Sequence, residues 1–230
     1  MITGFDYYIF MIPAFILAGL ATLFTKTTFN KYAHHESMSG LTGSEAARKM
    51  LSFKGISDVR IEEVDGFLSD HYDPLARTLR LSPGVYNSDS LSAIGVACHE
   101  AGHALQHATG YIPLTLRSAL VPAVQIGTYA PYILIGLGAA LNNFGLIKLG
   151  ILLFGLVVVF SLVTLPVEWN ASSRAKQLMV TAGIVSPTEQ AMAGKVLNAA
   201  FMTYVAAAFT ALLTLFYYLL RAGLIGRRDD

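Results

Sequence analysis

The sequence predicts a mainly α-helical, polytopic membrane protein with about four transmembrane helices and a small water-facing α+β domain. Of the 230 residues, 54% are hydrophobic and 13% are charged, whereas an ordinary soluble domain has about 25% charged residues. Four segments contain no Asp, Glu, Lys or Arg, namely residues 7–25, 118–147, 149–167 and 196–220. About 20 mostly apolar residues cross the roughly 30 Å hydrocarbon core as a helix. Each segment is therefore long enough to span a bilayer.

The alternatives to membrane spans fit this pattern poorly. A soluble protein would have to bury four all-apolar helices, and a chain of 230 residues is too small to surround them. The first segment lacks the basic leader of a signal peptide, because residues 1–6 carry one negative charge and no positive charge. We therefore expect a retained anchor in residues 1–25, two spans in 118–167, and a fourth span in 196–220 followed by a tail.

The charge pattern argues against a nucleic-acid partner, and the cysteine content excludes an intramolecular disulfide. The formal net charge is +1, and the basic residues form no stripe with interleaved aromatic residues. The sequence therefore indicates no nucleic-acid partner. Cys98 is the only cysteine, so an intramolecular disulfide is impossible. The expected surroundings are a lipid bilayer, which the chain is expected to cross several times.

Residues 26–117 form a polar block that we expect to face water. This block holds nine of the sixteen basic residues and ten of the fifteen acidic ones. Thr42 and Glu45 have the spacing of a capping box, which predicts a short helix that ends near Gly55. Two extended runs follow, residues 59–64 and 78–81, and they predict a small sheet.

An alanine-rich run over residues 88–109 predicts the next helix. Ser88 or Asp89 is the expected N-cap, and Thr109-Gly110 is the expected stop. After the third span, residues 168–195 predict further helices, one of them opened by Ser186-Pro187.

The helix over 88–109 carries a metal-binding motif, His99-Glu100-Ala101-Gly102-His103. Positions i and i+4 lie on one helix face, so His99 and His103 can present two imidazole nitrogens to one ion. A catalytic zinc site uses three protein ligands and leaves the fourth position for water. Glu100 can accept the proton of that water as general base. The expected cofactor is Zn²⁺.

The third ligand has several candidates in the sequence, namely His34, His35, His71, His107 and an acidic residue elsewhere. His107 fits poorly, because three ligands in an i, i+4, i+8 series place the outer pair about 12 Å apart. Glu168 is the better candidate, since it directly follows a charge-free segment and is expected to begin a helix. A carboxylate at the end of a membrane helix is costly unless it is paired or bound to a metal. Its alternative role is an ordinary interfacial charge.

The chain resembles the YugP-type family of neutral zinc metallopeptidases, which are bacterial membrane proteins. The resemblance covers nearly the whole chain and rests on four segments: Leu68-Ser69-Asp70-His71-Tyr72-Asp73-Pro74, Leu79-Arg80-Leu81-Ser82-Pro83, Ala93-Ile94-Gly95-Val96-Ala97-Cys98-His99-Glu100-Ala101-Gly102-His103-Ala104 and Leu165-Pro166-Val167-Glu168-Trp169-Asn170-Ala171-Ser172. The family is similar in logic to gluzincin membrane proteases of the heat-shock and prenyl-protein-processing type. This resemblance implies a zincin-like catalytic domain with Glu168 as third ligand.

The resemblance also implies roles for residues around the metal. Gluzincins have an Asp four residues after the ligand Glu, and this chain has Ser172 there, whose neutral hydroxyl is a weaker partner for a ligand histidine. The strand before the zinc helix is the substrate-docking edge in such proteases, so Leu79, Arg80, Leu81 and Ser82 are expected to bind an extended peptide by strand addition. His71 or Tyr72 is a candidate transition-state donor, or this segment only shapes a turn.

The basic residues flanking the spans indicate the orientation. With four spans, six of them fall on the side of the polar block: Lys26, Lys31, Arg117, Arg174, Lys176 and Lys195. Four fall on the other side: Lys148, Arg221, Arg227 and Arg228. The positive-inside rule therefore places the catalytic block in the cytoplasm, although the C-terminal arginines argue the other way.

Together these features predict a membrane-embedded zinc metalloendopeptidase that hydrolyses peptide bonds of peptide or membrane-protein substrates with zinc-activated water. A site-2-type intramembrane protease shares the zinc motif but places it on a membrane-spanning helix, and residues 82–92 before this motif are rich in Ser, Asn and Asp. A non-peptidase zinc hydrolase is a second alternative. A non-catalytic membrane scaffold with a structural metal is the third, and it has no need of Glu100.

Overall fold

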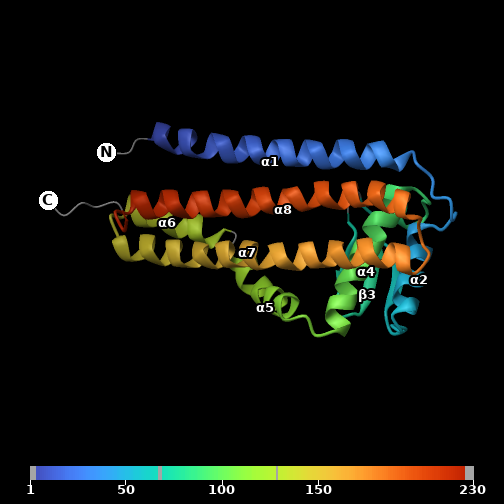
Figure 1. Cartoon of the computed structure of the whole chain (residues 1–230). Coiled ribbons are helices and arrows are strands. Elements are labelled where there is room, and N and C mark those ends of the chain that lie inside the picture. The colour runs from blue at the N-terminus through green and yellow to red at the C-terminus, as the bar shows by residue number, and fades with distance from the viewer. Residues whose placement is uncertain (1–3, 67–68, 128, 226–230) are drawn as a thin grey trace. The chain divides into compact units, whose positions relative to one another are not determined.

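The computed structural model describes residues 4–66, 69–127 and 129–225 (Figure 1). Leu68 of the family motif and Arg227 and Arg228 of the tail lie outside the described residues. The described chain is mainly helical with one small sheet. Its helices are α1 (Gly4–Ala33), α2 (Gly43–Phe53), α3 (Pro83–Tyr86), α4 (Leu91–Ala108), α5 (Ile112–Gly127), α6 (Ala130–Ala140), α7 (Phe144–Thr181) and α8 (Pro187–Arg221). Its strands are β1 (Arg60–Glu63), β2 (His71–Asp73) and β3 (Thr78–Leu81).

The chain folds into two compact units. Unit 1 consists of Met1–Leu20, Leu116–Leu165 and Thr203–Asp230, and unit 2 consists of Ala21–Thr115 and Pro166–Met202. Unit 1 contains most of the charge-free sequence, and unit 2 contains the sheet, α2 and α4. All residues of the predicted metal site belong to unit 2.

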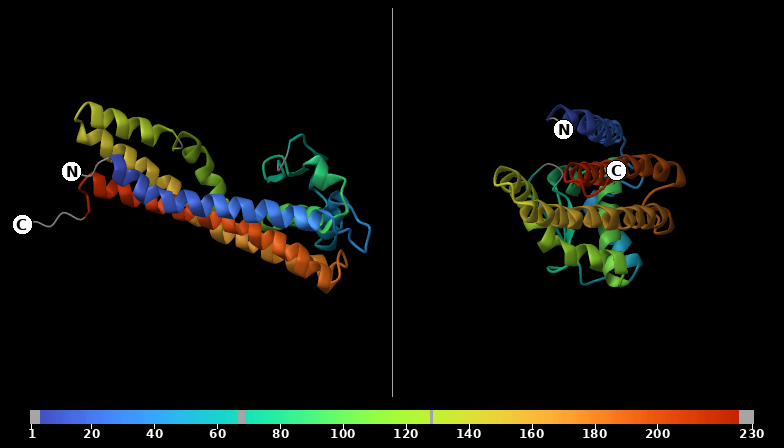
Figure 2. Two further views of the ribbon diagram at one scale, coloured as in Figure 1. Left: turned by 90° about the horizontal axis from the view of Figure 1, so that it is seen from above. Right: turned by 90° about the vertical axis from the view of Figure 1, so that its left-hand side faces the viewer.

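Among the described residues, α1, α7 and α8 are long and apolar enough to cross a membrane. Figure 2 shows these three as long, uninterrupted ribbons. The second expected span is instead divided into α5 and α6, which are bent by 42° and supply a fourth crossing if they count as one span. Pro131 stands in the first turn of α6. Proline has no backbone N–H and disfavours helical geometry in the residue before it, which explains a break at this point.

The structure differs from the sequence prediction where helices join. A new helix was expected to begin at Glu168, but α7 is one helix of 38 residues that continues through Pro166. A proline inside a helix removes one hydrogen bond and favours a kink, and packing on both sides can hold the helix together. In the same way α8 continues from Pro187 to Arg221, where two separate helices were expected. The predictions of helix starts at residues 168 and 196 are therefore wrong.

The short elements of unit 2 follow local sequence rules. Thr42 caps α2 with the predicted capping box, in which its side chain accepts from the backbone N–H of Glu45 and the Glu45 side chain accepts from the backbone of Thr42. Gly55, just after this helix, has φ +71°, a conformation that glycine adopts without steric cost. The N-cap of α4 is Ser90, whose hydroxyl accepts from the backbone N–H of Ala93, so α4 begins slightly later than predicted.

The sheet has the order β1-β3-β2, which corrects one prediction. Leu79 of β3 is paired in parallel with Ile61 of β1 and in antiparallel fashion with Tyr72 of β2. Because β3 is the central strand, both of its edges are already hydrogen-bonded. Leu79 and Leu81 are also fully buried. The prediction that a substrate adds as a strand to Leu79, Arg80, Leu81 and Ser82 is therefore wrong. The edge strands are β1 and β2.

One face of the sheet and the buried side of α4 share a hydrophobic core. Leu79, Ile61 and Leu81 pack with Ile94, Ala97 and Ala101 of α4, and α2 and the second half of α7 complete the core with Met50, Leu178 and Met179. Cys98 is part of this core, and its burial raises the pKa of the thiol to about 12.

Gly102 sets the spacing between α4 and α7. A Cβ atom added at Gly102 would lie 2.7 Å from the backbone carbonyl oxygen of Ala171, closer than real Cβ contacts allow. The backbones of the two helices therefore meet at a point where no larger residue fits.

Gly102→Ala is expected to destabilise the protein, although alanine is favoured over glycine by up to ~1 kcal/mol in a helix interior. Relief of the overlap requires α4 and α7 to separate, and overpacking of this kind costs about 1–3 kcal/mol. Gly95→Ala in the same helix is the control, since its Cβ would make ordinary contacts of 3.5 Å with Ala193. Thermal unfolding in detergent measures both. A Gly102→Ala protein as stable as Gly95→Ala would contradict the close contact.

Candidate metal centre

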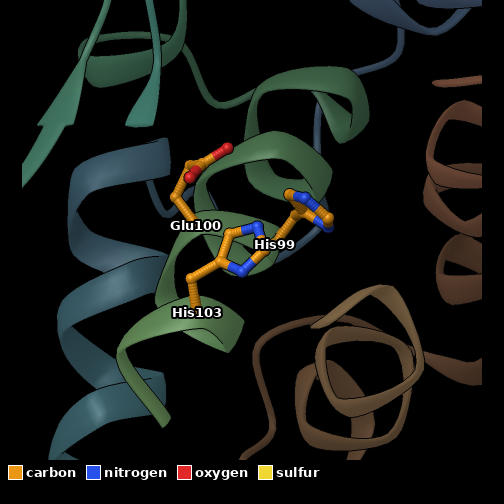
Figure 3. A group of neighbouring side chains, drawn as sticks. All are labelled: His99, Glu100 and His103. Carbon is orange, nitrogen blue, oxygen red and sulfur yellow. The ribbon is translucent and has the colours of Figure 1, made fainter. Parts of the chain in front are cut away.

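The two histidines of the motif lie side by side on α4. Their ring centroids are 4.8 Å apart, and the rings are nearly perpendicular. Figure 3 shows both rings on the same part of the helix, with the Glu100 side chain extending from the adjacent position. Candidate ligand atoms of His99, Glu100 and His103 all lie within 4.8 Å of one another. This group is positioned to bind a metal ion.

Glu168 of α7 reaches the same two rings. Its Oε2 atom lies 3.1 Å from His99 Nε2 and 3.6 Å from His103 Nε2. The residue is only 1% exposed. Three ligand atoms placed tetrahedrally at 2.0–2.1 Å from zinc are separated from each other by about 3.4 Å. The distances of 3.1 and 3.6 Å lie on either side of that value, so Glu168 Oε2 and the two Nε2 atoms suit a zinc ion.

Gln106 fixes the orientation of His103. Its side-chain nitrogen donates to the Val167 carbonyl at 2.8 Å and to Asn170 Oδ1 at 3.0 Å. A carbonyl can only accept, so the amide oxygen of Gln106 must face the other way, toward His103 Nδ1 at 3.0 Å. His103 therefore carries its proton on Nδ1, which leaves the Nε2 lone pair for a metal.

Ser172 occupies the corresponding place beside His99. Its Oγ lies 3.0 Å from His99 Nδ1, one turn of α7 beyond Glu168. With His99 Nε2 directed at Glu168, the Nδ1–H group can donate to this hydroxyl. The structure thus brings together His99, His103, Glu168 and Ser172, which the sequence analysis had singled out.

Opposing effects act on the protonation of His103. Burial lowers the pKa of this imidazole, while the hydrogen bond and charge of Glu168 and the charge of Glu100 raise it, and the net direction is upward. A nearby negative charge favours the cationic form of histidine in the same way that it favours a bound cation. The site is therefore electrostatically suited to a divalent metal.

His71 and Tyr72 lie on β2 with their side chains on opposite faces of the sheet. His71 contacts the Ser69 carbonyl at 2.7 Å and Arg80 at 3.4 Å, and its register partner is Arg80. Tyr72 packs against the core that contains α4, and its hydroxyl lies 2.9 Å from His107 Nδ1. Neighbouring residues of a strand point to opposite sides. Of the two candidate donors, Tyr72 is the one directed toward the zinc helix.

A cavity of about 280 Å³ lies beside this tyrosine. Its lining comprises Ile56, Asp58, Val59, Tyr72, Arg77, Ala104, His107 and Ala108. Ala104 and His107 follow Glu100 and His103 by one helical turn, so the cavity adjoins the face of α4 that carries these residues. Burial raises the pKa of Tyr72, which therefore stays protonated at neutral pH and can donate a hydrogen bond.

The other ligand candidates are engaged elsewhere. The ring of His107 bonds Tyr72, and His35 Nδ1 lies 3.0 Å from the Lys31 carbonyl. His34 is exposed. In the described part of the chain, the metal-ligating group found contains none of these three residues.

Ser82 is held by Asp70 through its backbone N–H at 2.8 Å and through its hydroxyl at 3.1 Å. The pKa of the Asp73 carboxyl is lowered by the backbone N–H of Ala76 and next by Arg80, which donates to this carboxylate at 2.9 Å. These bonds, with the buried Leu79 and Leu81, give the segment 79–82 a structural role.

Comparison with known proteins now decides the family. The family described as “Putative neutral zinc metallopeptidase” matches residues 7–223. This chain belongs to that family. It is also 47% identical over 215 residues to a protein of Bacillus subtilis (strain 168) named “Putative membrane protease YugP”, and the match covers 93% of this chain and 95% of the relative. No solved structure matches the chain. The resemblance stated from the sequence is confirmed, and the family name implies zinc.

Sequence reasoning missed the residues that orient the ligands. Gln106 lies three residues after His103 on the same side of α4, which the helical period could have revealed. Asn170 stands two residues after Glu168 and accepts from both Gln106 and Arg174. The Tyr72–His107 pair could not be found in this way, because it joins a strand to a helix 35 residues later.

Gln106→Leu is expected to weaken zinc binding about 10- to 100-fold, the usual effect of removing a hydrogen-bond partner of a ligand histidine. The variant leaves His103 Nδ1 without its acceptor and frees the ring to rotate. Competition with a metal chelator measures the affinity. His107→Ala is the matched control, since His107 is next in sequence and bonds Tyr72 instead. Equal zinc affinity in the two variants would show that Gln106 does not orient the ligand.

Proposed function

We propose that this protein is a membrane-embedded, zinc-dependent metalloendopeptidase with His99, His103 and Glu168 as zinc ligands and Glu100 as general base. The observation that carries the proposal is the convergence of Glu168 Oε2 on the Nε2 atoms of both histidines, at 3.1 and 3.6 Å. The family and the name of the Bacillus relative support a protease role.

Each residue has a distinct chemical task. A zinc ion held by this donor set supplies Lewis-acid polarisation and lowers the pKa of a water molecule toward 7. Glu100 is partly exposed beside the ligands, so its carboxylate can take the proton of the attacking water and pass it to the leaving amine. Tyr72, protonated and directed toward α4, is the candidate donor to the oxyanion.

The substrate is proposed to dock along β2. This strand is an edge of the sheet, and it lies beside α4. An extended peptide can add to such an edge through main-chain hydrogen bonds, which give affinity with little dependence on side-chain identity. The cavity beside Tyr72 then receives a side chain of the bound peptide, since it opens next to the same strand.

Four membrane crossings fit the chain path, and the positive-inside rule favours a cytoplasmic catalytic unit. Residues 21–115 and 166–202 belong to the same unit, and α7 leads from Phe144 back to that unit. A return crossing by α7 requires an outward crossing by α5 and α6. Basic residues at the boundaries of unit 2, such as Lys26, Lys31, Arg174 and Lys176, then lie on the cytoplasmic side.

The site-2-type alternative is not favoured by the zinc helix. In the described chain, α4 is absent from the helices that are long and apolar enough to span. It is N-capped by Ser90 and packs with the sheet, as a helix of a water-facing domain does. The scaffold alternative leaves the position of Glu100 beside two histidines without a purpose.

The decisive experiment compares detergent-purified wild type with Glu100→Gln and Glu168→Gln. Glu100→Gln is expected to retain zinc and to lose peptide cleavage by about 10²- to 10⁴-fold, the range for removal of a general base. Glu168→Gln is expected to lose zinc, since the amide is a poor ligand. Metal analysis and cleavage of casein or a fluorogenic peptide measure the two properties.

Glu62→Gln, at an exposed position of β1, is the control for a charge change on another element. It should retain both zinc and cleavage. Equal cleavage by wild type and Glu100→Gln would overturn the catalytic assignment, and unchanged zinc content in Glu168→Gln would overturn the third ligand.

A further inference from the structure

The charge-free stretches of three helices end within unit 2, which comprises Ala21–Thr115 and Pro166–Met202. On α1 the first charge after residue 25 is Lys26, on α7 the first after residue 167 is Glu168, and on α8 the last before residue 196 is Lys195. At each of these positions the sequence changes from uncharged residues, which suit a lipid environment, to residues that include charges, which suit water. Contacts within unit 2 show whether these three positions lie at the same level in the structure.

Contacts place the three changes at one level. Thr25 Oγ1 donates to the Ala199 carbonyl at 2.9 Å, and the rings of Trp169 and Phe201 are 5.2 Å apart. Thr25, Trp169 and Ala199 lie within about one helical turn, 5.4 Å, of the changes at residues 26, 168 and 196, and Phe201 lies about 7.5 Å along α8 from residue 196. We call this the boundary level, defined by Thr25, Trp169 and Ala199.

The orientations of α1, α7 and α8 place their charge-free ends on the same side of this level. On α7 and α8, Lys176 bonds Asn198 whereas Trp169 meets Phe201, so these two helices are antiparallel. Beyond the end of α1, Met38 bonds Glu189, whereas Thr25 bonds Ala199, so α8 is antiparallel to α1 as well. Within unit 2, the charge-free ends of the three helices therefore lie on the same side of the boundary level.

Trp169 has the surroundings of an interfacial residue. It is 55% exposed, and the ammonium group of Lys176 lies 5.3 Å from the centroid of its ring. Tryptophan is enriched at headgroup depth, and lysine near a helix end directs its charge to the same layer. An aromatic ring and a cation together at the boundary level match a lipid headgroup region.

The metal centre stands at this same level. Glu168 directly precedes Trp169, is buried, and contacts both ligand histidines. The backbones of α4 and α7 meet at Gly102 and Ala171, within one turn of Trp169. A peptide bond bound at this site therefore lies within a few ångströms of the plane that Trp169 marks.

We propose that the zinc centre operates at the headgroup level of the bilayer and that its substrates are polypeptides anchored in the same membrane, cut within a few residues of their membrane segment. A substrate anchored in the bilayer reaches this level without leaving the membrane, whereas a soluble peptide must bind from bulk water. The substrate part of this proposal rests on the proposed function, and the depth part stands independently of it.

The depth can be measured with the native protein, since Trp169 is its only tryptophan. Full-length Glu100→Gln, chosen to prevent self-cleavage, is reconstituted in phosphatidylcholine vesicles with bromine placed either near the headgroup end or near the methyl end of the acyl chains. Tryptophan fluorescence is expected to be quenched more by the shallow bromines than by the deep ones, and only weakly by aqueous iodide.

Two matched variants calibrate the depth. Trp169→Phe with Phe160→Trp moves the reporter nine residues along α7, about 13 Å deeper, and should be quenched most by deep bromines. Trp169→Phe with Phe53→Trp moves it to an exposed position on α2, which should respond mainly to iodide. If Trp169 behaves like the Phe160→Trp reporter, the site lies in the hydrocarbon. If it behaves like Phe53→Trp, the site lies in water. Either result overturns the proposed depth.

The substrate class is tested with wild type and one cleavable sequence in three forms. The sequence is joined directly to a transmembrane helix, joined through a long flexible Gly/Ser linker, or supplied as a soluble peptide. Cleavage of the direct fusion is expected to exceed that of the soluble peptide by about 10²-fold or more, because anchoring raises the effective concentration. The long linker should reduce cleavage. Equal rates for the three forms would overturn the substrate class alone, whereas cleavage that persists in Glu100→Gln would overturn the proposed function.

Discussion

The buried carboxylate of Glu168 is the constraint on which the arrangement of unit 2 depends. A carboxylate that is 1% exposed is costly unless cations or hydrogen-bond donors compensate it. Here the two imidazole groups of α4 provide the compensation, so α7 must approach α4 closely enough for contacts of 3.1 and 3.6 Å. Gly102 permits that approach, and Gln106 joins the two helices through the Val167 carbonyl. The close approach of α4 and α7 therefore sets both the geometry of the ligands and the packing of the two helices.

Much of the candidate site could be predicted from local sequence. The i, i+4 spacing places His99 and His103 on one face, and Glu168 stands out because a charge interrupts an apolar run. Local rules also predicted the α2 capping box, since it needs only residues three apart. The Tyr72–His107 bond and the Gln106 bridge join elements far apart in sequence. No local period carries such information, and only the fold reveals it.

The two main errors concern long-range pairing and helix continuity. The resemblance to gluzincin proteases implied that β3 is an edge strand, but strand order depends on pairing between distant residues, and β1 and β2 occupy the edges. The helix start expected at Glu168 followed from the change in composition there. Composition reflects the solvent around a helix and not its hydrogen bonds, so α7 passes from apolar to polar sequence without interruption.

The continuity of α7 has a mechanical consequence. Its first part is a candidate membrane span, and its later part carries Glu168. The tilt of a membrane helix adjusts to the thickness of the hydrocarbon layer. A rigid helix that extends about 30 Å from its lipid-embedded end would displace a group at its other end by about 2–3 Å for a tilt of 5°. Such a displacement exceeds the tolerance of a metal site. Pro166, two residues before Glu168, has no backbone N–H, so α7 lacks one helical hydrogen bond there and can bend more easily between its apolar part and Glu168.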